Sequence, residues 1–355
     1  MNALRLIAGK TARARIKQDG LTPEMIKMVL GASGGPKWLV LLGLDKFVFG
    51  HWLHTSTHKI DLIGSSIGAW RMASAAHPNA LKTIETFIGL YMQFRSEHAA
   101  NAEVLTTASY SFLHKLYSPA EATRLVINPL RNLNIVTARV KGLRENSSRF
   151  KEAGSIIVSA AANSLRRDHL AKFYERVVFY SGEHEACPEA WSGFSQSNVK
   201  LSGDILADVL MASGSIPFVG EPVINIEGAP KGVYRDGGII DYHFDTPWNI
   251  DDGIILYPHF YPYLIPGWFD KRIKSRVVKG AVWDNILLLA PSEAFIQALP
   301  KGKIPDRNDF ISMNDAERLN YWAAVTKESE RLAEEFADCL EEPDKLYARL
   351  EIAPA

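Results

Sequence analysis

Cysteine is scarce in this sequence, and neither sign of charge dominates it. Cys187 and Cys339 are the only two cysteines among 355 residues, so no disulfide framework is expected. This scarcity is typical of a reducing compartment, and we predict a cytoplasmic protein. Lys and Arg together number 40, as do Asp and Glu, which gives a formal net charge of +0. The balance argues against a chain built around nucleic-acid binding, because such chains carry a basic excess.

The sequence also lacks an apolar run long enough to cross a membrane. Its most apolar region, residues 25–53, is interrupted by Lys27, Lys37, Asp45 and Lys46. A spanning helix needs about 20 nearly uninterrupted apolar residues. The N-terminal residues show no apolar stretch of the signal-peptide kind. We therefore predict neither a transmembrane segment nor a leader.

Alternating strand and helix patterns are present in the front third of the chain. Ile26–Gly31 and Lys59–Ile63 are short apolar runs that end at glycine, as buried strands do. Lys37–Phe49 and Ile67–Ala76 have helical length and spacing. This order predicts an α/β fold with a mostly parallel central sheet and helices on both of its faces.

The rest of the chain adds further expected elements without a visible linker. The expected strands are Asn134–Val140, Ser155–Ser159, Arg176–Tyr180, Val223–Ile226, Gly232–Tyr234 and Gly253–Tyr257. The expected helices are Leu81–Arg95, one opened by Ser118 and Pro119, Gly203–Ala212, and a long one over Asn314–Leu340. No segment rich in Pro, Gly and Ser divides the chain, so we predict one domain over residues 1–355 with helical insertions.

Residues 64–68 read GSSIG and match the pattern G-x-S-x-G. A predicted strand precedes the match and a predicted helix follows it, which is the setting of a nucleophile elbow. Gly64 and Gly68 provide the room that such a tight turn needs. Ser66 would lie at a helix N-terminus, where developing negative charge is stabilised. The alternative is an ordinary strand-to-helix turn with a capping serine.

A glycine-rich loop, residues 31–37 (GASGGPK), follows the first of these strands. It lacks the G-K-[ST] ending of a phosphate-binding loop and the G-x-G-x-x-G of a dinucleotide fold. Exposed backbone N–H groups in such a loop suit an oxyanion hole. A plain tight turn is the alternative. No nucleotide or other cofactor is predicted.

Residues 234–238 (YRDGG) place Asp236 after a strand-like stretch and before two glycines. A constrained turn there would hold the carboxylate against a facing hydroxyl. Taken alone, the D-G dipeptide favours a routine β-turn.

Together, these three motifs resemble the patatin-like phospholipase family, in which they occur in the same order. Residues 212–217 (ASGSIP) are similar to the small-residue segment that precedes the family's aspartate. The resemblance covers residues 27–247, with residues 248–355 expected to pack on this core. It implies a patatin-like α/β fold and lipid acyl hydrolysis of the phospholipase A or lysophospholipase type. It also implies a Ser66–Asp236 dyad, with Gly34, Gly35, Ser33 and Lys37 in the oxyanion loop.

The chain departs from the family's pattern at several positions. The family's loop reads D-G-G-G-x-R/K-G, whereas this chain has Ala32 for the aspartate, Ser33 for the first glycine and Trp38 for the last. A histidine triad is a rival to the dyad, and His243, seven residues after Asp236, is its foremost candidate.

Two further segments carry expectations about metal and membrane. His51, His54 and His58 have a spacing that a zinc site could use, but they straddle an expected helix end, and we predict no metal. Residues 256–269 (LYPHFYPYLIPGWF) precede a basic cluster, and we predict transient membrane-surface contact through 256–276. The alternative is a loop that packs on the core or walls the acyl cleft.

Three functions remain open from the sequence. The first is a serine lipid acyl hydrolase acting on a lipid ester. The second is an acyltransferase or thioesterase that uses the same dyad. The third is a catalytically inactive lipid-binding module, which the presence of both Ser66 and Asp236 disfavours.

Overall fold

The described strands of the computed structural model form one mixed, mostly parallel sheet of 11 strands. The structure describes residues 2–354 except 96, 98–100, 187–190, 192, 249 and 251, so Cys187 lies outside the described residues. The strands are β1 (Leu4–Ala8), β2 (Ile26–Gly31), β3 (Ile60–Ser65), β4 (Arg131–Val140), β5 (Tyr174–Tyr180), β6 (Gln196–Lys200), β7 (Val223–Ile224), β8 (Val233–Asp236), β9 (Ile254–Pro258), β10 (Ile286–Pro291) and β11 (Leu350–Ile352). Their order is β11-β1-β10-β9-β2-β3-β4-β5-β6, with β8 paired to both β4 and β7.

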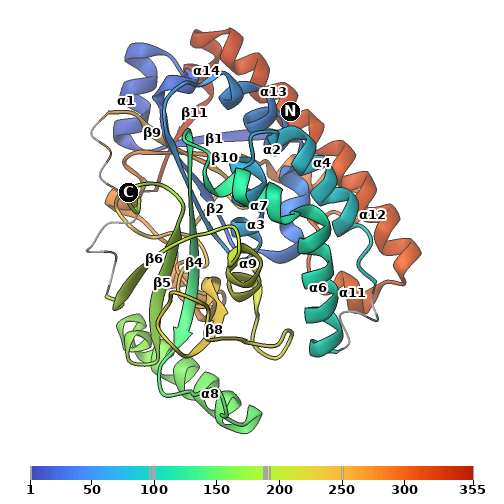
Figure 1. Cartoon of the computed structure of the whole chain (residues 1–355). Coiled ribbons are helices and arrows are strands. Elements are labelled where there is room, and N and C mark those ends of the chain that lie inside the picture. Colours follow the sequence, from blue (N-terminus) through green and yellow to red (C-terminus); the bar gives the residue numbers. More distant parts are fainter. Residues whose placement is uncertain are drawn as a thin grey trace.

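Helices cover the sheet, most of them on one side in Figure 1, with α1 on the other. They are α1 (Lys10–Asp19), α2 (Leu42–Phe47), α3 (Ile67–Ala76), α4 (Ala80–Tyr91), α6 (Ala102–Leu116), α7 (Pro119–Val126), α8 (Arg149–Leu165), α9 (Leu206–Gly214), α10 (Glu293–Ala298), α11 (Asp309–Ser312), α12 (Asp315–Glu328), α13 (Glu330–Glu341) and α14 (Pro343–Arg349). Every residue of α3 is buried, because this helix lies between the sheet and the outer helices. No helix in the described part of the chain is long and apolar enough to cross a membrane.

Strand β4 brings the C-terminal ends of β3 and β8 together, although these two strands are far apart in the sequence. Its first part pairs in parallel with β3, whose last residue, Ser65, lies opposite Val136. Its last part pairs antiparallel with β8, whose last residue, Asp236, lies opposite Thr137. Because Val136 and Thr137 are adjacent, β3 and β8 approach each other along the same edge of β4 and both end at the same point. This junction positions the site described below.

The predicted α/β class with a mostly parallel sheet is confirmed, and most expected elements are found. The strand predicted over Ser155–Ser159 is wrong, because this segment lies inside α8. Ser148 caps that helix by accepting a hydrogen bond from the N–H of Lys151. The three alanines that follow this segment, residues 160–162, favour the helix over the local β-branched run. The long C-terminal helix is divided in two at Ser329, and Asn314 caps its first half.

Residues 248–355 extend the same sheet. Strand β9 pairs in parallel with β2, and β10 pairs in parallel with β9. The N-terminal strand β1, which the sequence analysis did not anticipate, lies between β10 and β11. Both ends of the chain therefore contribute to the core on which the motif segments rest.

Candidate active site

Ser66 lies at the strained turn between β3 and α3. Its backbone has φ 55° and ψ −131°, a region that non-glycine residues rarely adopt. The flanking glycines permit the turn: a Cβ at Gly68 would lie 1.9 Å from the carbonyl oxygen of Gly31, and one at Gly64 would lie 2.5 Å from the Cα of Ala69. The sequence GSSIG therefore forms the sharp elbow expected of it.

The hydroxyl of Ser66 donates a hydrogen bond to the carboxylate of Asp236, with 2.7 Å between Oγ and Oδ2. The other carboxylate oxygen, Oδ1, accepts from the N–H of Gly238 at 2.7 Å. Both side chains are buried, since Ser66 is 4% and Asp236 5% exposed. The two residues are 170 positions apart in the chain, and the junction along β4 brings them together.

The small-residue segment 212–217 supports both members of the pair. Ser213 Oγ accepts a hydrogen bond from the N–H of Ser66 at 2.9 Å and donates to the carbonyl of Val136 at 2.8 Å. The carbonyl of Ser215 accepts from the N–H of Asp236 at 3.0 Å. Ser213 and Ser215 thus fix the backbones of the two residues from one short segment.

Burial raises the pKa of Asp236 from its ordinary value to about 6. The hydrogen bonds from Ser66 and Gly238 oppose this rise, as do the charges of Arg307 and Lys271. A carboxyl with a pKa near 6 is a stronger base than a free aspartate and is still mostly ionised at neutral pH. This balance suits a general base.

The glycine-rich loop leads into a 3₁₀ helix over Gly35–Leu41. Within the described part of the chain, the N–H groups of Gly34 and Gly35 have no hydrogen-bond partner, and both residues line a cavity together with Ser66. The N–H of Ser33 differs, because it donates to the carbonyl of Tyr242 at 2.9 Å. Gly34 and Gly35 are therefore the donors in this loop that are free to bind an oxyanion.

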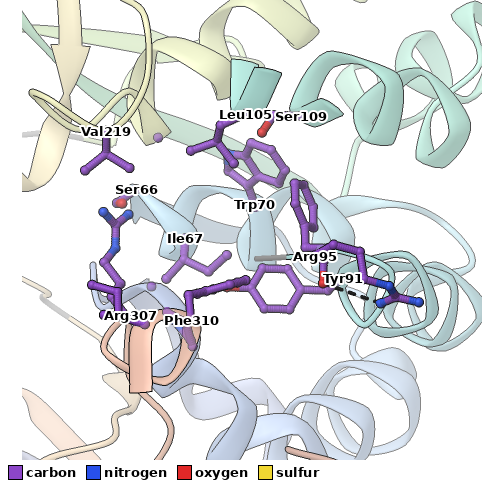
Figure 2. A pocket seen from close by; sticks show the side chains of 15 residues that line it. Ser66, Ile67, Trp70, Tyr91, Arg95, Leu105, Ser109, Val219, Arg307 and Phe310 are labelled. Carbon is purple, nitrogen blue, oxygen red and sulfur yellow. Dashed lines mark hydrogen bonds between the residues drawn. The ribbon is translucent and has the colours of Figure 1, made fainter. Parts of the chain in front are cut away.

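Two cavities meet at Ser66. The first, of about 260 Å³, is walled mainly by apolar side chains from α3, α4 and the residues after it, α6, the segment after α9, and α11. They are Ile67, Trp70, Tyr91, Phe94, Leu105, Val219, Phe310 and Ile311. Figure 2 shows these side chains around the cavity, with Ser66 at one side and Ser109 beyond Trp70. The second cavity, of about 580 Å³, also contains Asp236, Gly34 and Gly35. Hereafter these are the apolar cavity and the polar cavity.

The polar cavity is lined by three cationic side chains, Lys37, Lys271 and Arg307. None of the three forms an ion pair with a described carboxylate within 4.0 Å. Asp306 also lines the cavity, but Lys303 already holds it at 3.0 Å. Asp236 is the second carboxylate of the lining, so three cationic and two acidic side chains line the cavity beside Ser66.

The histidine triad is not assembled. His243 is fully buried, and its Nδ1 accepts from the N–H of Ile265 at 3.0 Å. Its ring packs against that of His259, with centroids 4.2 Å apart, and burial holds its pKa well below the ordinary value. Among the described residues, no histidine lines either cavity. His77 is also occupied elsewhere, since it bonds to Glu121.

No metal site is found in the described part of the chain, where no group of three or more His, Cys, Asp or Glu side chains converges. His58 is occupied locally, because its Nε2 donates a hydrogen bond to the carbonyl of Ile26 at 2.8 Å. His51 and His54 are exposed on the connector before β3.

Most of segment 256–269 packs inside the fold. Leu256, Tyr257, Phe260 and Leu264 are each 0% exposed. Phe260 packs against the oxyanion loop, since a Cβ at Gly34 would meet its ring at 2.5 Å. Tyr263 reaches the surface, where it is 37% exposed, and membrane contact through this segment stays a prediction.

The basic residues that follow this segment are divided between two environments. Arg276 donates to the buried Asp270, whereas Lys271 is exposed and lines the polar cavity, where its Nζ lies 4.0 Å from the ring centroid of Tyr242. Arg272 and Lys274 are exposed. The basic cluster is therefore not a single surface patch.

Arg307 is the site residue that the sequence analysis missed. It lies in the turn before α11, in the charged stretch DRND, and no motif marks it. Its side chain extends toward Ser66 in Figure 2, and its Nε would lie 3.2 Å from a Cβ at Gly35. Only the folding of the C-terminal part of the chain onto the motif core reveals its position.

Comparison with family models, with curated proteins and with solved structures found no match to this chain. The likeness to patatin-like phospholipases therefore remains a prediction from the motifs. The functional argument that follows relies on the geometry of the site.

Proposed function

We propose that this protein is a serine acyl hydrolase that acts on lipid esters, with Ser66 as nucleophile and Asp236 as general base. The observation that carries the proposal is the 2.7 Å hydrogen bond between Ser66 Oγ and Asp236 Oδ2 where the two cavities meet. A serine hydroxyl is a weak nucleophile until an adjacent base accepts its proton. The strained elbow supports the proposal, because backbone strain of this kind clusters at functional sites.

In the acylation half of the reaction, Ser66 Oγ attacks the ester carbonyl carbon while its proton passes to Asp236. The resulting oxyanion accepts hydrogen bonds from the N–H groups of Gly34 and Gly35. When the tetrahedral intermediate collapses, the bond to the alcohol breaks, and the leaving oxygen takes the proton from Asp236. The products are the free alcohol and an acyl ester on Ser66.

In the deacylation half, a water molecule attacks the acyl ester and gives a proton to Asp236. The second tetrahedral intermediate is stabilised by the same two N–H groups. Its collapse breaks the bond to Ser66 Oγ, which recovers the proton from Asp236. The carboxylic acid leaves, and the Ser66–Asp236 pair is restored.

The two cavities match the two halves of a lipid ester. The apolar cavity suits the acyl chain, since burial of each methylene contributes about 0.8 kcal/mol. The polar cavity then takes the alcohol half. At the mouth, Phe218 and Ile311 are 66% and 88% exposed, and such side chains suit contact with a lipid surface.

An acyltransferase or thioesterase is the second candidate, because Ser66 and Asp236 would form the same acyl-enzyme. The polar cavity, of about 580 Å³, has room for an acceptor alcohol in the place of the attacking water, which a transferase would need. Adding glycerol to the assay separates the two, since a transferase forms a glyceride and a hydrolase releases the free acid.

Labelling with a fluorophosphonate tests the proposal most directly. We expect one adduct on Ser66, located by mass spectrometry of the digested protein, and its loss in Ser66→Ala. Asp236→Asn should also lower ester hydrolysis by several orders of magnitude, and the double variant should lose little more than either single one. Ser65→Ala, which changes the neighbouring serine, is the matched control and should still be labelled. An unlabelled Ser66 in a folded protein would leave the inactive lipid-binding module as the better account.

A further inference from the structure

We propose that one exposed face of helix α8 binds the same face of a second copy of this chain, with the two helices antiparallel. The face consists of six exposed small or apolar residues: Phe150, Gly154, Ile157, Val158, Ala161 and Leu165. Hereafter this set is called the α8 seam. The inference concerns the surface of the molecule and does not depend on the proposed function.

The first support is the concentration of exposed apolar side chains on this one helix. Its four large members are exposed as follows: Phe150 91%, Leu165 77%, Ile157 68% and Val158 53%. They are four of the eleven exposed large apolar side chains in the described part of the chain, so the exposure is not scattered. The opposite face holds α8 to the fold, since Asn163 is 1% exposed and donates to Asp270 at 2.8 Å. In Figure 1, α8 lies at the lower edge of the molecule, where its outer face is open.

The second support is a glycine that a single copy does not need. Gly154 lies inside α8, where glycine is a poorer helix former than alanine. A Cβ at this position would meet nothing within 4 Å, so packing within the chain does not require its absence. The missing side chain would instead let the axis of a second helix approach closely, because the distance between packed helices depends on the side chains at their contact.

The third support is that the α8 seam is complementary to itself. Its residues are spaced symmetrically about the midpoint between Ile157 and Val158. Around a two-fold axis at that point, each copy forms the same pairs with the other: Phe150 with Leu165, Gly154 with Ala161, and Ile157 with Val158. Large side chains then meet at both ends, and small ones meet where the helices approach. A face that fits its own copy gives a closed two-fold dimer, and spacings of four and three residues are typical of paired helices.

The fourth support is the placement of charge along α8. Lys151 is exposed in the first turn, and the last turn has no basic side chain. A cation is stabilised near a helix C-terminus, where the last carbonyls carry partial negative charge. In the antiparallel pair, Lys151 of each copy lies opposite Ser164 in the last turn of the other α8. The charges are therefore complementary across the pair, which argues for the antiparallel orientation.

Sedimentation velocity of the full chain tests the proposal. A helix of 17 residues is about 25 Å long, so the contact is at the small end of specific interfaces. We expect a monomer–dimer equilibrium with a dissociation constant of roughly 1–100 µM. Ile157→Glu, which places a charge at the two-fold axis, should weaken the dimer by about 100-fold or more. Ile127→Glu is the matched control, because Ile127 is also 68% exposed but lies at the end of α7, and it should dimerise like the wild type.

Gly154→Leu distinguishes a second copy from a lipid surface. The added side chain would separate the two helices, and we expect the dimer to weaken by about tenfold or more. The thermal midpoint of the monomer should not fall, because the position is open and leucine is the better helix former. On a lipid surface, the same change would add apolar area and strengthen binding.

A wild type that stays monomeric at about 200 µM, well above the expected dissociation constant, would overturn the proposal. So would a dimer that either Ile157→Glu or Gly154→Leu leaves intact, or one that Ile127→Glu weakens as much as Ile157→Glu does. Vesicles of phosphatidylcholine and phosphatidylglycerol test the lipid alternative. If a monomeric wild type binds them, and binding is lost in Ile157→Glu and strengthened in Gly154→Leu, the α8 seam belongs to a lipid surface and the dimer is overturned.

Discussion

At the scale of single residues, the site combines groups that are costly to bury. Asp236 is removed from water, and only two hydrogen bonds and the field of nearby cations compensate its carboxylate. Ser66 is held at φ 55°, where a side chain is strained. The surrounding structure holds both residues in place despite these costs. Ser213 accepts a hydrogen bond from the N–H of Ser66, and the carbonyl of Ser215 accepts one from the N–H of Asp236.

The burial of Asp236 predicts a pH dependence of stability. Its pKa is raised from 3.8 unfolded to about 6 folded, so the unfolded state releases the proton first as pH rises. The free energy of unfolding of the wild type should therefore fall between about pH 4 and pH 7, by about 3 kcal/mol from this group, at about 1.36 kcal/mol per pKa unit. Asp236→Asn should lack that fall, as measured by urea denaturation across this range.

Ser66→Ala is the control for this prediction, because the proposed function expects it to be inactive too, while it keeps the carboxylate. It should retain the wild-type fall or steepen it, since it removes the Ser66 hydrogen bond that lowers the pKa of Asp236. Parallel stability curves for Asp236→Asn and the wild type would show that the carboxylate carries no such cost.

At the scale of elements, the turn after β3 positions Ser66, whereas α4 and α6 line the apolar cavity. Helix α6 encloses this cavity with Leu105 and Ser109. Ser109 is 9% exposed and lies on the far side of Trp70 from Ser66 in Figure 2. Under the proposed function, the length of the accepted acyl chain should therefore depend on α6 and be independent of Ser66 and Asp236.

Filling the apolar cavity from α6 should shorten the preferred acyl chain. Ser109→Phe places a ring where the distal methylenes would lie, and each methylene left unburied costs about 0.8 kcal/mol. We expect kcat/KM for a dodecanoyl p-nitrophenyl ester to fall about tenfold or more relative to the acetyl ester. Ser111→Phe, on an exposed position of the same helix, should keep the wild-type ratio. An unchanged chain-length profile in Ser109→Phe would remove the acyl chain from this cavity.

At the scale of the whole molecule, the motif-bearing segments do not form a separate unit. Strand β2, which leads into the glycine-rich loop, is paired on one side with β3 and on the other with β9. Strands β9 and β10 and residue Arg307 all come from the chain beyond residue 247. Ser66 and Asp236 thus lie at strand ends of one sheet, to which both ends of the chain contribute strands.

A fragment of residues 27–247 should fail to fold. It would lack β1, β9, β10 and β11, and the fully buried apolar residues of β2, Val29 and Leu30, would lie on an open edge. We expect aggregation or a non-cooperative thermal transition by circular dichroism, while the full chain unfolds in one transition. A monomeric fragment with a cooperative transition would show instead that the motif core is a domain of its own.

Much of the site was predictable from sequence, because its parts are local. A strand, a glycine at each end of the turn and a following helix are enough to define the elbow at Ser66. The turn at Asp236 and the loop at Gly34 and Gly35 are encoded by near neighbours in the same way. The segment 155–159 shows the limit of local patterns, since five residues with strand propensity lie inside a helix of 17.

Only the tertiary structure decided which of these parts meet. Ser66 and Asp236 are 170 residues apart, and their contact depends on the register of β3 and β8 along β4. The same packing sequesters His243 in the core and places Lys271 in the lining of the polar cavity. It also brings Arg307 close to Ser66. Sequence neighbours fix the shape of a turn, but the side chains that share a cavity are fixed by strand pairing and helix packing between distant segments, which a local pattern does not encode.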